Sequence, residues 1–368
     1  MNQTELLYTL ALQLVPGIGS LLGRKLIERL GSAEAVFQTS TTRLAATPGI
    51  GPALAQALAT HRPLPAAEAE LNKAEKHGLR ILHFKDAEFP ARLRQTPDHP
   101  LLLFGKGKLP LNMNRVVAVV GTRSATTYGK QLSEDLVRGL VPYNVQIVSG
   151  LAYGIDICAH RAALLHGLPT IGVLGHGLGR LYPAAHRQTA ERMLEEGGLL
   201  TECWYDAGPD KENFPKRNRI VAGMADAVVV VEAAENGGAL ITAHIANDYS
   251  RDVFAFPGRV NDAFQAGCHK LIMQNKAGMI CAAADLIAAM NWGAPSEEVS
   301  GMRQMSLFLE LEPDEQALYD VLPVHGWIGI DDLCLQSGFS VSKISHLLLA
   351  LEFKAVLRQA PGKLYGRV

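Results

Sequence analysis

The stretch Val116–Gly129, VVAVVGTRSATTYG, decides the fold class of this 368-residue chain. Its first five residues are four valines and an alanine, a composition typical of a strand that is buried on both faces of a sheet. A loop of glycine and small hydroxyl residues follows directly, and then the helical pattern KQLSEDLVRGLV. A buried strand, a glycine-containing loop and a helix form the first half of a β-α-β unit, so the sequence predicts an α/β fold.

The same order of strand, loop and helix recurs along the middle of the chain. We expect strands at residues 116–120, 145–148, 170–174, 198–201, 227–231 and 253–256. This alternation predicts a doubly wound, Rossmann-like parallel sheet whose strands all end at one edge. Ligands bind at that edge, near the point where the strand order reverses. Glycine and small hydroxyl residues expose backbone N–H groups there. We therefore assign to an anion site Gly121, Thr122, Ser149, Gly150 and Gly237.

The stretch FPKRNRIVAG adds side chains to the same edge. Shortly before the fifth strand it supplies Phe214, Lys216, Arg217, Asn218 and Arg219. Arg123 projects from the first loop towards this segment. Cations that track a phosphate backbone, combined with a flat ring on which a base can stack, are what hold single-stranded nucleic acid. The net charge of the whole chain is −1, so this anion groove is a local patch.

Other uses of these residues stay open. The cations can instead form salt bridges with Asp210, Glu212 or Asp226, and Phe214 can pack beneath its own segment. We read FPKRNR as a loop in which Pro215 sets the direction of entry.

The bulk composition narrows the class of protein. A hydrophobic fraction of 48% and a charged fraction of 19% describe a folded chain rather than a disordered one. The five cysteines are irregularly spaced, which favours reduced thiols in a cytoplasmic protein. The N-terminus lacks the basic region of a secretory signal, and no run of about 18 apolar residues predicts a membrane span.

We expect neither a cofactor nor a metal. The loop GTRSATTYG does not supply the G-x-G-x-x-G dinucleotide fingerprint, and no Walker lysine motif is present. His176 and His186 lie in loops without the spacing of metal ligands.

An enzymatic alternative rests on Glu232 and the turn ENGG that follows it. A glycine pair that cradles phosphate and a carboxylate that acts on the sugar would suit a Rossmann-fold nucleotide or sugar-phosphate hydrolase. Asp156 and His160, four residues apart on one predicted helix, could form an acid–base pair. The structural alternatives are that Asp156 caps the N-terminus of the helix and that His160 makes a structural hydrogen bond.

Flanking blocks complete a domain plan. It comprises a helical domain at 1–70, a connector at 71–112, the Rossmann-like domain at 113–292, a linker at 293–311 and a winged-helix domain at 312–368. In the first block VPGIG (15–19) recurs as TPGIG (47–51), each copy before a helical stretch, as in helix-hairpin-helix motifs. Lys25 and Arg29 favour phosphate contact there, while helices that only pack are the alternative. The winged-helix block either binds DNA or serves protein interaction.

Six motifs in the middle of the chain resemble the DNA-processing protein A family (DprA, also called Smf). They are, in order, GTRSATTYG, SGLAYGIDICAHRAAL, TIGVLGHGLGRLYPAAH, FPKRNRIVAG, VVEAAENGGALITAHIA and VFAFPG. The resemblance covers about residues 116–275, and the flanking blocks fit the longer members. Two positions depart from the family pattern. Gly237–Ala239 stands where Ser-Gly-Ser is usual, and His269 stands where asparagine is usual.

The resemblance implies a non-enzymatic role. Members bind single-stranded DNA taken up in natural transformation, protect it and load the RecA recombinase on it. It carries a DNA-contacting role over to Arg123 and to FPKRNR. It also implies a homodimer whose surface falls near the segment 268–280. The residues assigned to that surface are His269, Leu271, Ile272 and Met279.

Overall fold

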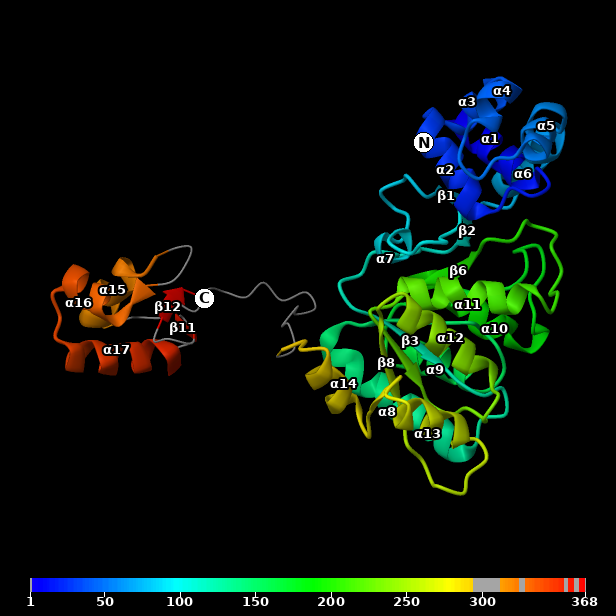
Figure 1. Ribbon diagram of the computed structural model, residues 1–368. Helices are drawn as coiled ribbons and strands as arrows, with labels where there is room; N and C mark the ends of the chain where they lie inside the picture. Colours follow the sequence, from blue (N-terminus) through cyan, green and yellow to red (C-terminus); the bar gives the residue numbers. More distant parts are fainter. Residues whose placement is uncertain (1, 294–311, 324–327, 354–356, 361–363, 368) are drawn as a thin grey trace. The chain divides into compact units, whose positions relative to one another are not determined.

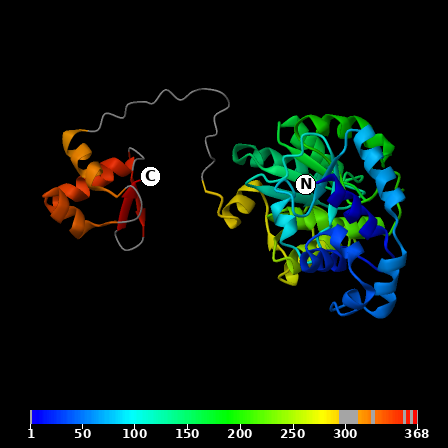
Figure 2. The ribbon, with the colours of Figure 1, turned by 90° about the horizontal axis from the view of Figure 1, so that it is seen from above.

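The computed structural model describes residues 2–293, 312–323, 328–353, 357–360 and 364–367. The chain forms two compact units, residues 1–296 and residues 297–368, which are drawn in Figures 1 and 2. The predicted linker lies, apart from Gly293, outside the described residues. Each unit has its own hydrophobic core and is described separately below.

The N-terminal part of the first unit is helical, as predicted. Its helices are α1 (Gln3–Leu14), α2 (Ser20–Leu30), α3 (Ala33–Gln38), α4 (Thr41–Ala45), α5 (Pro52–Thr60) and α6 (Leu64–Lys76). The two PGIG repeats form the turns before α2 and α5. Gly17 (φ 83°) and Gly49 (φ 89°) adopt the left-handed conformation that these turns require. The repeat is therefore a pair of equivalent helix–turn–helix connections.

The segment expected as a connector contributes to the sheet. It holds β1 (Arg80–His83), α7 (Ala91–Arg94) and β2 (Leu102–Lys106). β2 pairs antiparallel with β6 (Gly198–Thr201), and β1 pairs antiparallel with β2. β1 was missed, because the charged residues around ILHF mask a four-residue strand.

The predicted doubly wound sheet is present in the first unit. Its nine strands lie in the order β1-β2-β6-β5-β4-β3-β7-β8-β9. The remaining strands are β3 (Val116–Val120), β4 (Gln146–Ser149), β5 (Thr170–Val173), β7 (Ala227–Val230), β8 (Asp252–Ala255) and β9 (Gly278–Met279). From β6 to β9 all neighbours are parallel. The chain order reverses between β3 and β7, which places the expected ligand crevice between the ends of these two strands.

Helices cover both faces of this sheet (Figure 1). They are α8 (Thr127–Leu140), α9 (Ile155–Leu165), α10 (Arg187–Glu196), α11 (Asn213–Met224), α12 (Gly238–Asp248), α13 (Ala266–Met273) and α14 (Ala283–Ala289). Alternate residues of β3 serve different cores. Val117 and Val119 pack with α8, α9 and α14, whereas Val116, Ala118 and Val120 share a core with α11 and α12. Burial on both faces explains why the strand VVAVV is continuously apolar.

The second unit has the predicted winged-helix order. It contains α15 (Pro313–Val321), β10 (Ile328–Gly329), α16 (Ile330–Ser337), α17 (Val341–Phe353), β11 (Leu357–Ala360) and β12 (Leu364–Arg367). The three strands form a small sheet in the order β10-β12-β11. Ser340 caps α17, since its Oγ accepts the N–H of Lys343 at 3.4 Å.

Candidate nucleic-acid interface

A groove opens at the carboxyl ends of the central strands, with a cavity volume of about 560 Å³. It lies where the strand order reverses, between the loops after β3 and β7. Eight of the eleven residues predicted from sequence to bind DNA line it. They are Gly121, Thr122, Arg123, Gly150, Phe214, Arg217, Asn218 and Gly237. The topology thus brings together segments that are more than 100 residues apart in the chain.

The segment FPKRNR is helical, not a loop. It forms the first turn and a half of α11, with Glu212 as the N-cap. Pro215 is tolerated because the N–H groups of a first helical turn have no intrahelical partner in any case. The helix directs Phe214 into the groove and spaces the cations around its own axis, so they do not all face the same way.

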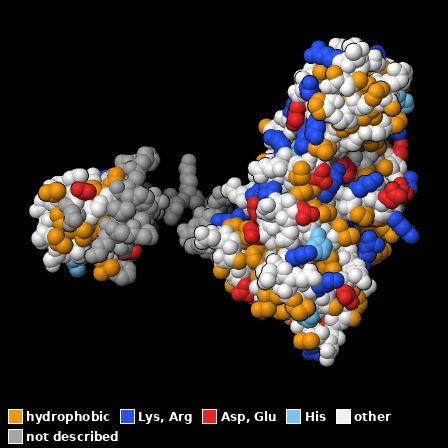
Figure 3. All heavy atoms as spheres, in the orientation of Figure 1, with side chains coloured by type: hydrophobic (Ala, Val, Ile, Leu, Met, Phe, Trp, Pro, Cys, Tyr) orange, Lys and Arg blue, Asp and Glu red, His pale blue; other side chains and the backbone are white. Residues whose placement is uncertain are grey.

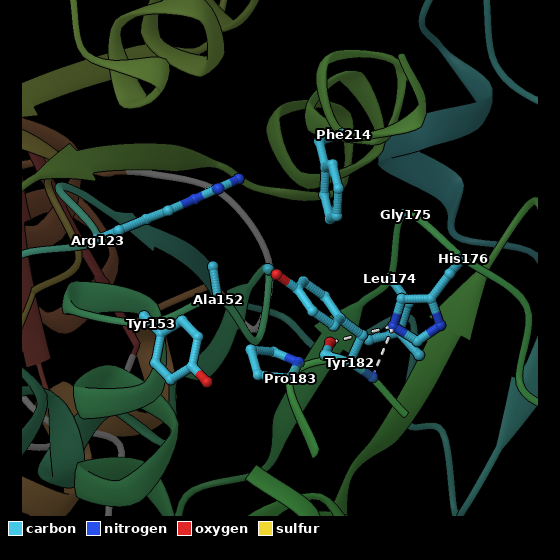
Figure 4. A pocket seen from close by; sticks show the side chains of 10 residues that line it. Arg123, Ala152, Tyr153, Leu174, Gly175, His176, Tyr182, Pro183 and Phe214 are labelled. Atoms are coloured by element: carbon cyan, nitrogen blue, oxygen red, sulfur yellow. Dashed lines mark hydrogen bonds between the residues drawn. The ribbon is translucent and has the colours of Figure 1, made fainter. Parts of the chain in front are cut away.

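An aromatic end of the groove is shown in Figure 4. The guanidinium of Arg123 lies 5.4 Å from the centre of the Phe214 ring, within range of a cation–π interaction. The ring of Tyr182 lies 6.3 Å from that of Phe214 and is tilted by 51°. Tyr182 and Tyr153 are about half exposed, at 46% and 47%. Phe214 is therefore partly open to the groove rather than packed out of sight.

Sequence reasoning missed these two tyrosines. Tyr153 stands in SGLAYG after β4, and Tyr182 in GHGLGRLYP after β5. A pattern that could have predicted them is the presence of one aromatic residue in each of these glycine-rich loops, which follow strand ends. Tyr182 is fixed by His176, whose Nε2 lies 3.1 Å from the Tyr182 carbonyl and 3.2 Å from its N–H.

The predicted cations divide into exposed and engaged ones. Arg123 and Lys216 are exposed, and neither forms an ion pair with the residues that the structure describes. Lys211 is exposed as well and lines the groove, although the sequence analysis passed over it. Arg219 is engaged, because it forms an ion pair with Glu202 and donates to the carbonyl of Asp98 at 2.6 Å. Lys216 projects beside the groove rather than lining it.

Arg217 is buried at the bottom of the groove, with an exposed fraction of 6%. Its Nη1 donates to the carbonyl of Val173 at 2.5 Å. It faces Asp156, whose carboxylate accepts the N–H groups of Gly150 at 3.2 Å and Ala152 at 3.4 Å. Burial raises the pKa of Asp156, and the Arg217 charge opposes that shift. Arg217 thus braces the loop after β4 and is not an outward cation.

Close packing explains a glycine in this loop. A Cβ on Gly150 would lie 2.0 Å from Nη1 of Arg217, so only glycine lets the guanidinium reach its place. Ser149, the neighbouring predicted site residue, is fully buried and donates to the carbonyl of Val119 at 2.6 Å. Its hydroxyl is used inside the sheet and cannot contact a ligand in the groove.

Glu232 holds the loop that carries Arg123. Its carboxylate is fully buried and accepts the N–H of Thr126 at 3.0 Å and the Thr126 hydroxyl. The Glu232 carbonyl accepts the N–H of Thr122 at 2.7 Å. A carboxylate at the N-terminus of α8 is also favoured by the helix dipole. The side chain therefore faces inwards and does not line the groove.

Asp156 and His160 do not form an acid–base pair. The N-cap of α9 is Gly154, and Asp156 uses its oxygens on the preceding loop. His160 is fully buried, with Nδ1 2.7 Å from the hydroxyl of Thr170. Because that hydroxyl donates to the carbonyl of Ile147, it accepts from His160, which places the proton on Nδ1. The structural hydrogen bond expected for His160 is confirmed.

His160 makes stability depend on pH. Burial lowers its pKa from 6.5 to about 3, so between these values the unfolded state binds the extra proton. The stabilisation is complete above pH 6.5 and is lost as the pH falls. His160→Asn keeps an N–H donor for Thr170 without the titration. Between pH 7 and pH 5 the free energy of unfolding of the wild type should fall by about 2 kcal/mol more than that of the variant, as measured by denaturant unfolding. Equal losses in both proteins would contradict this assignment.

The residues assigned to a dimer surface differ in exposure. Leu271 is 1% exposed and belongs to the core beneath α13, so it is not available on the surface of this chain. The pattern CHKLIM did not reveal which face of the helix is inward. Met279 is 59% exposed and the neighbouring Met273 is 76% exposed, while His269 and Ile272 are half-buried. His269, Ile272 and Met273 lie on α13, and Met279 lies on the edge strand β9.

Cations in the flanking domains are partly engaged. Lys343, the cation of the helix α17, pairs with Asp314 at 2.8 Å and lies over the ring of Phe339. Arg367 donates to the carbonyls of Asp320 and Leu322. Lys25 and Arg29 of α2 remain exposed. Lys354 and Lys363 lie outside the described residues.

Two searches of the described ranges gave negative results. No helix among them is both long enough and apolar enough to cross a bilayer. No group of three or more histidine, cysteine or acidic residues among them is placed to hold a metal ion. On the face in Figure 3, basic and acidic side chains are interspersed over residues 2–293, in keeping with the net charge of −1.

Comparison with known proteins identifies the family. The family model described as DNA recombination-mediator protein A matches residues 80–291, more than half of the chain. The chain belongs to this family. The model described as the DprA winged helix domain matches residues 309–363, and a SAM-like helix-hairpin-helix tandem matches residues 9–60. All three blocks of the chain therefore correspond to known domain types.

Relatives in this family match most or all of the chain. Protein Smf of Synechocystis is 30% identical over 100% of both chains. A putative DNA processing protein DprA of Mycobacterium tuberculosis is 34% identical over 85% of this chain and 84% of its own.

Two solved structures of the family share the fold. DNA processing protein A from Streptococcus pneumoniae superposes with a TM-score of 0.67 at 33% identity, over 78% of this chain and 98% of its own. The protein from Helicobacter pylori has a TM-score of 0.53 at 28% identity, over 59% of this chain and 97% of its own. Its structure is described as giving insights into a unique single-stranded DNA binding mode.

Proposed function

We propose that this chain binds single-stranded DNA in the groove at the strand ends and acts there as a recombination mediator. In this role it protects incoming DNA during natural transformation and loads a RecA-type recombinase on it. The observation that carries the proposal is the aromatic end of the groove. There an exposed cation, Arg123, lies over the partly exposed ring of Phe214, beside the exposed ring of Tyr182.

The geometry suits a flexible single strand better than a duplex. Stacking on aromatic rings requires unpaired bases, and each stacked base is worth about 1–3 kcal/mol. Arg123 and Lys211, which line the groove, and the exposed Lys216 beside it supply separate positive charges for the DNA backbone. The groove presents few directed base-reading groups, so binding is expected to be indifferent to sequence. The single-stranded DNA binding mode described for the Helicobacter pylori relative supports the preference for single strands.

We further propose that the chain acts by binding alone, as a cytoplasmic homodimer, and without covalent chemistry. The hydrolase alternative needs Glu232 to reach a sugar, but its carboxylate is fully buried and bonded to Thr126. The exposed apolar side chains of Met273 on α13 and Met279 on β9 are available for a contact between two copies. Sedimentation equilibrium tests the dimer, and a monomer at micromolar concentration would contradict it.

Purified protein and a labelled oligothymidine test the central proposal. Tight binding that weakens as salt is raised supports it, and binding to duplex of equal length should be weaker. Absence of binding at 0.1 M salt would contradict it. Faster assembly of RecA filaments on DNA coated with a single-strand-binding protein tests the loading step. Release of base or phosphate from nucleotides would instead favour the hydrolase.

Lys216 and Arg219, three residues apart on one helix, should respond differently to replacement by alanine. Lys216→Ala removes one phosphate contact, so the slope of log affinity against log salt should become about 0.7 less steep. The same loss corresponds to about fivefold weaker binding at 0.1 M salt.

Arg219→Ala serves as the matched control. It should leave the salt slope unchanged but lower the free energy of unfolding by about 2 kcal/mol, because it leaves Glu202 without its partner. Fluorescence anisotropy and urea unfolding measure the two effects. A flattened slope for Arg219→Ala would show that our division of the cations is wrong.

A further inference from the structure

One face of α6, in the N-terminal helical domain, contacts a loop of the Rossmann-like domain. Glu70, Lys73 and His77 follow one another at three- and four-residue intervals, so they share that face. Glu70 is 3% exposed, and its Oε1 accepts the N–H of Tyr205 at 2.5 Å. The ring of His77 stacks on that of Tyr205, with 4.5 Å between ring centres and an angle of 16°.

The contacts between α6 and this loop differ in strength. Lys73 pairs with Asp206 at 2.5 Å, but both side chains are largely exposed, at 44% and 64%. A surface pair of this kind contributes little and is screened by salt. The buried Glu70 carboxylate makes a charge-assisted hydrogen bond to a backbone N–H, which is the stronger type of interaction. Glu70 is therefore the residue on which this junction depends most.

The loop held by α6, residues 202–212, is bonded in turn to the loop after β5. The N–H of Gly177 donates to the carbonyl of Ala207 at 2.9 Å, and that of Gly179 donates to the carbonyl of Tyr205 at 2.9 Å. Figure 1 shows these green loops beside α6. These two hydrogen bonds join the loops into one wall.

This wall borders the groove. The loop at 202–212 supplies Pro209 and Lys211, and the loop after β5 supplies Tyr182. The backbone N–H and carbonyl of Tyr182 contact His176, so this residue's backbone belongs to the same framework. A chain of contacts thus leads from Glu70 to one aromatic residue, Tyr182, and one cation, Lys211, of the groove.

We infer that the N-terminal helical domain takes part in binding single-stranded DNA by positioning this wall through Glu70. Its own cations do not contact the DNA. The inference rests on the proposed function, since it concerns the same groove. Glu70 is a positioning residue, because it contacts the loop at 202–212 and that loop in turn borders the bound DNA.

The test combines binding with a local structural readout in the full chain. Glu70→Ala should raise the Kd for oligothymidine about fivefold and speed amide hydrogen exchange in residues 202–212. Glu70→Gln keeps an oxygen acceptor for the Tyr205 N–H and should leave both the Kd and the exchange in residues 202–212 unchanged. If Glu70→Ala fails to fold, His77→Ala, at an exposed position, should still raise the Kd about twofold.

A second background separates positioning from general damage. In Tyr182→Ala/Lys211→Ala, which already lacks the contacts of the wall, Glu70→Ala should add less than about twofold. An equal cost in both backgrounds would overturn the inference, as would faster loop exchange with unchanged affinity.

Direct contact by the helical domain is the remaining alternative. Lys25→Ala/Arg29→Ala should leave the salt slope unchanged, whereas two lost phosphate contacts would flatten it by about 1.4. That flattening would overturn the inference. Failure of the wild type itself to bind would contradict the proposed function instead.

Discussion

Replacing Arg123 and Phe214 together with alanine should raise the Kd for oligothymidine about 100-fold at 0.1 M salt. The loss of one stacked base costs about 1–3 kcal/mol of binding free energy. The loss of one phosphate contact weakens the affinity about fivefold, which corresponds to about 1 kcal/mol. Together they amount to about 2–4 kcal/mol, a range that includes the roughly 2.7 kcal/mol of a 100-fold change in affinity. The salt slope should fall by about 0.7, because only Arg123 carries charge.

Arg138→Ala is the matched control for this experiment. Arg138 is an exposed arginine of α8 that pairs with Asp135 and does not line the groove. Its removal should change neither Kd nor slope. Fluorescence anisotropy over a salt series measures all three proteins. If the double variant kept an affinity within threefold of wild type, the aromatic end of the groove would not be the binding site.

The second large effect concerns stability rather than binding. Arg217→Met should lower the free energy of unfolding by about 3 kcal/mol, because it leaves the buried Asp156 without an opposing charge. The hydrogen bond to the Val173 carbonyl is lost as well. Folded Arg217→Met should nevertheless keep the wild-type salt slope, since the guanidinium does not project to the strand.

A double variant distinguishes this explanation from simple loss of packing. Asp156→Asn/Arg217→Met removes both charges and keeps an oxygen that can accept the N–H of Gly150. It should recover most of the stability, within about 1 kcal/mol of wild type. Urea unfolding at pH 7 measures the cycle. Equal destabilisation in the single and double variants would show that the two charges do not compensate one another.

The strands were the most predictable part of the fold. β3 was predicted with its bounds, because five apolar residues between loops leave little choice of structure. The edge strands β1 and β9 were not predicted, since short strands on an edge need no continuous apolar run. FPKRNR was read as a loop because proline and clustered charge resemble loop composition, whereas proline in a first helical turn costs little.

The site was predictable in position but not in orientation. Sheet topology alone placed Arg123 and Phe214 at one edge, and both line the groove. Which cation of α11 faces solvent depends on helical phase and on partners far away in sequence. Arg217 faces Asp156 and Arg219 forms an ion pair with Glu202. No local sequence pattern predicts either pairing. The same reason explains Leu271, whose burial depends on how α13 packs on β8.

The pairing of β3 with β7 has a consequence for synthesis of the chain. Val117 is paired with Ala227, 227 − 117 = 110 residues later. At a translation rate of about 5–20 residues per second, β7 leaves the ribosome roughly 5–20 s after β3. During that interval one edge of the valine strand is open and prone to aggregation. Expression fragments should therefore extend beyond Val230, because shorter ones leave this central edge permanently unpaired.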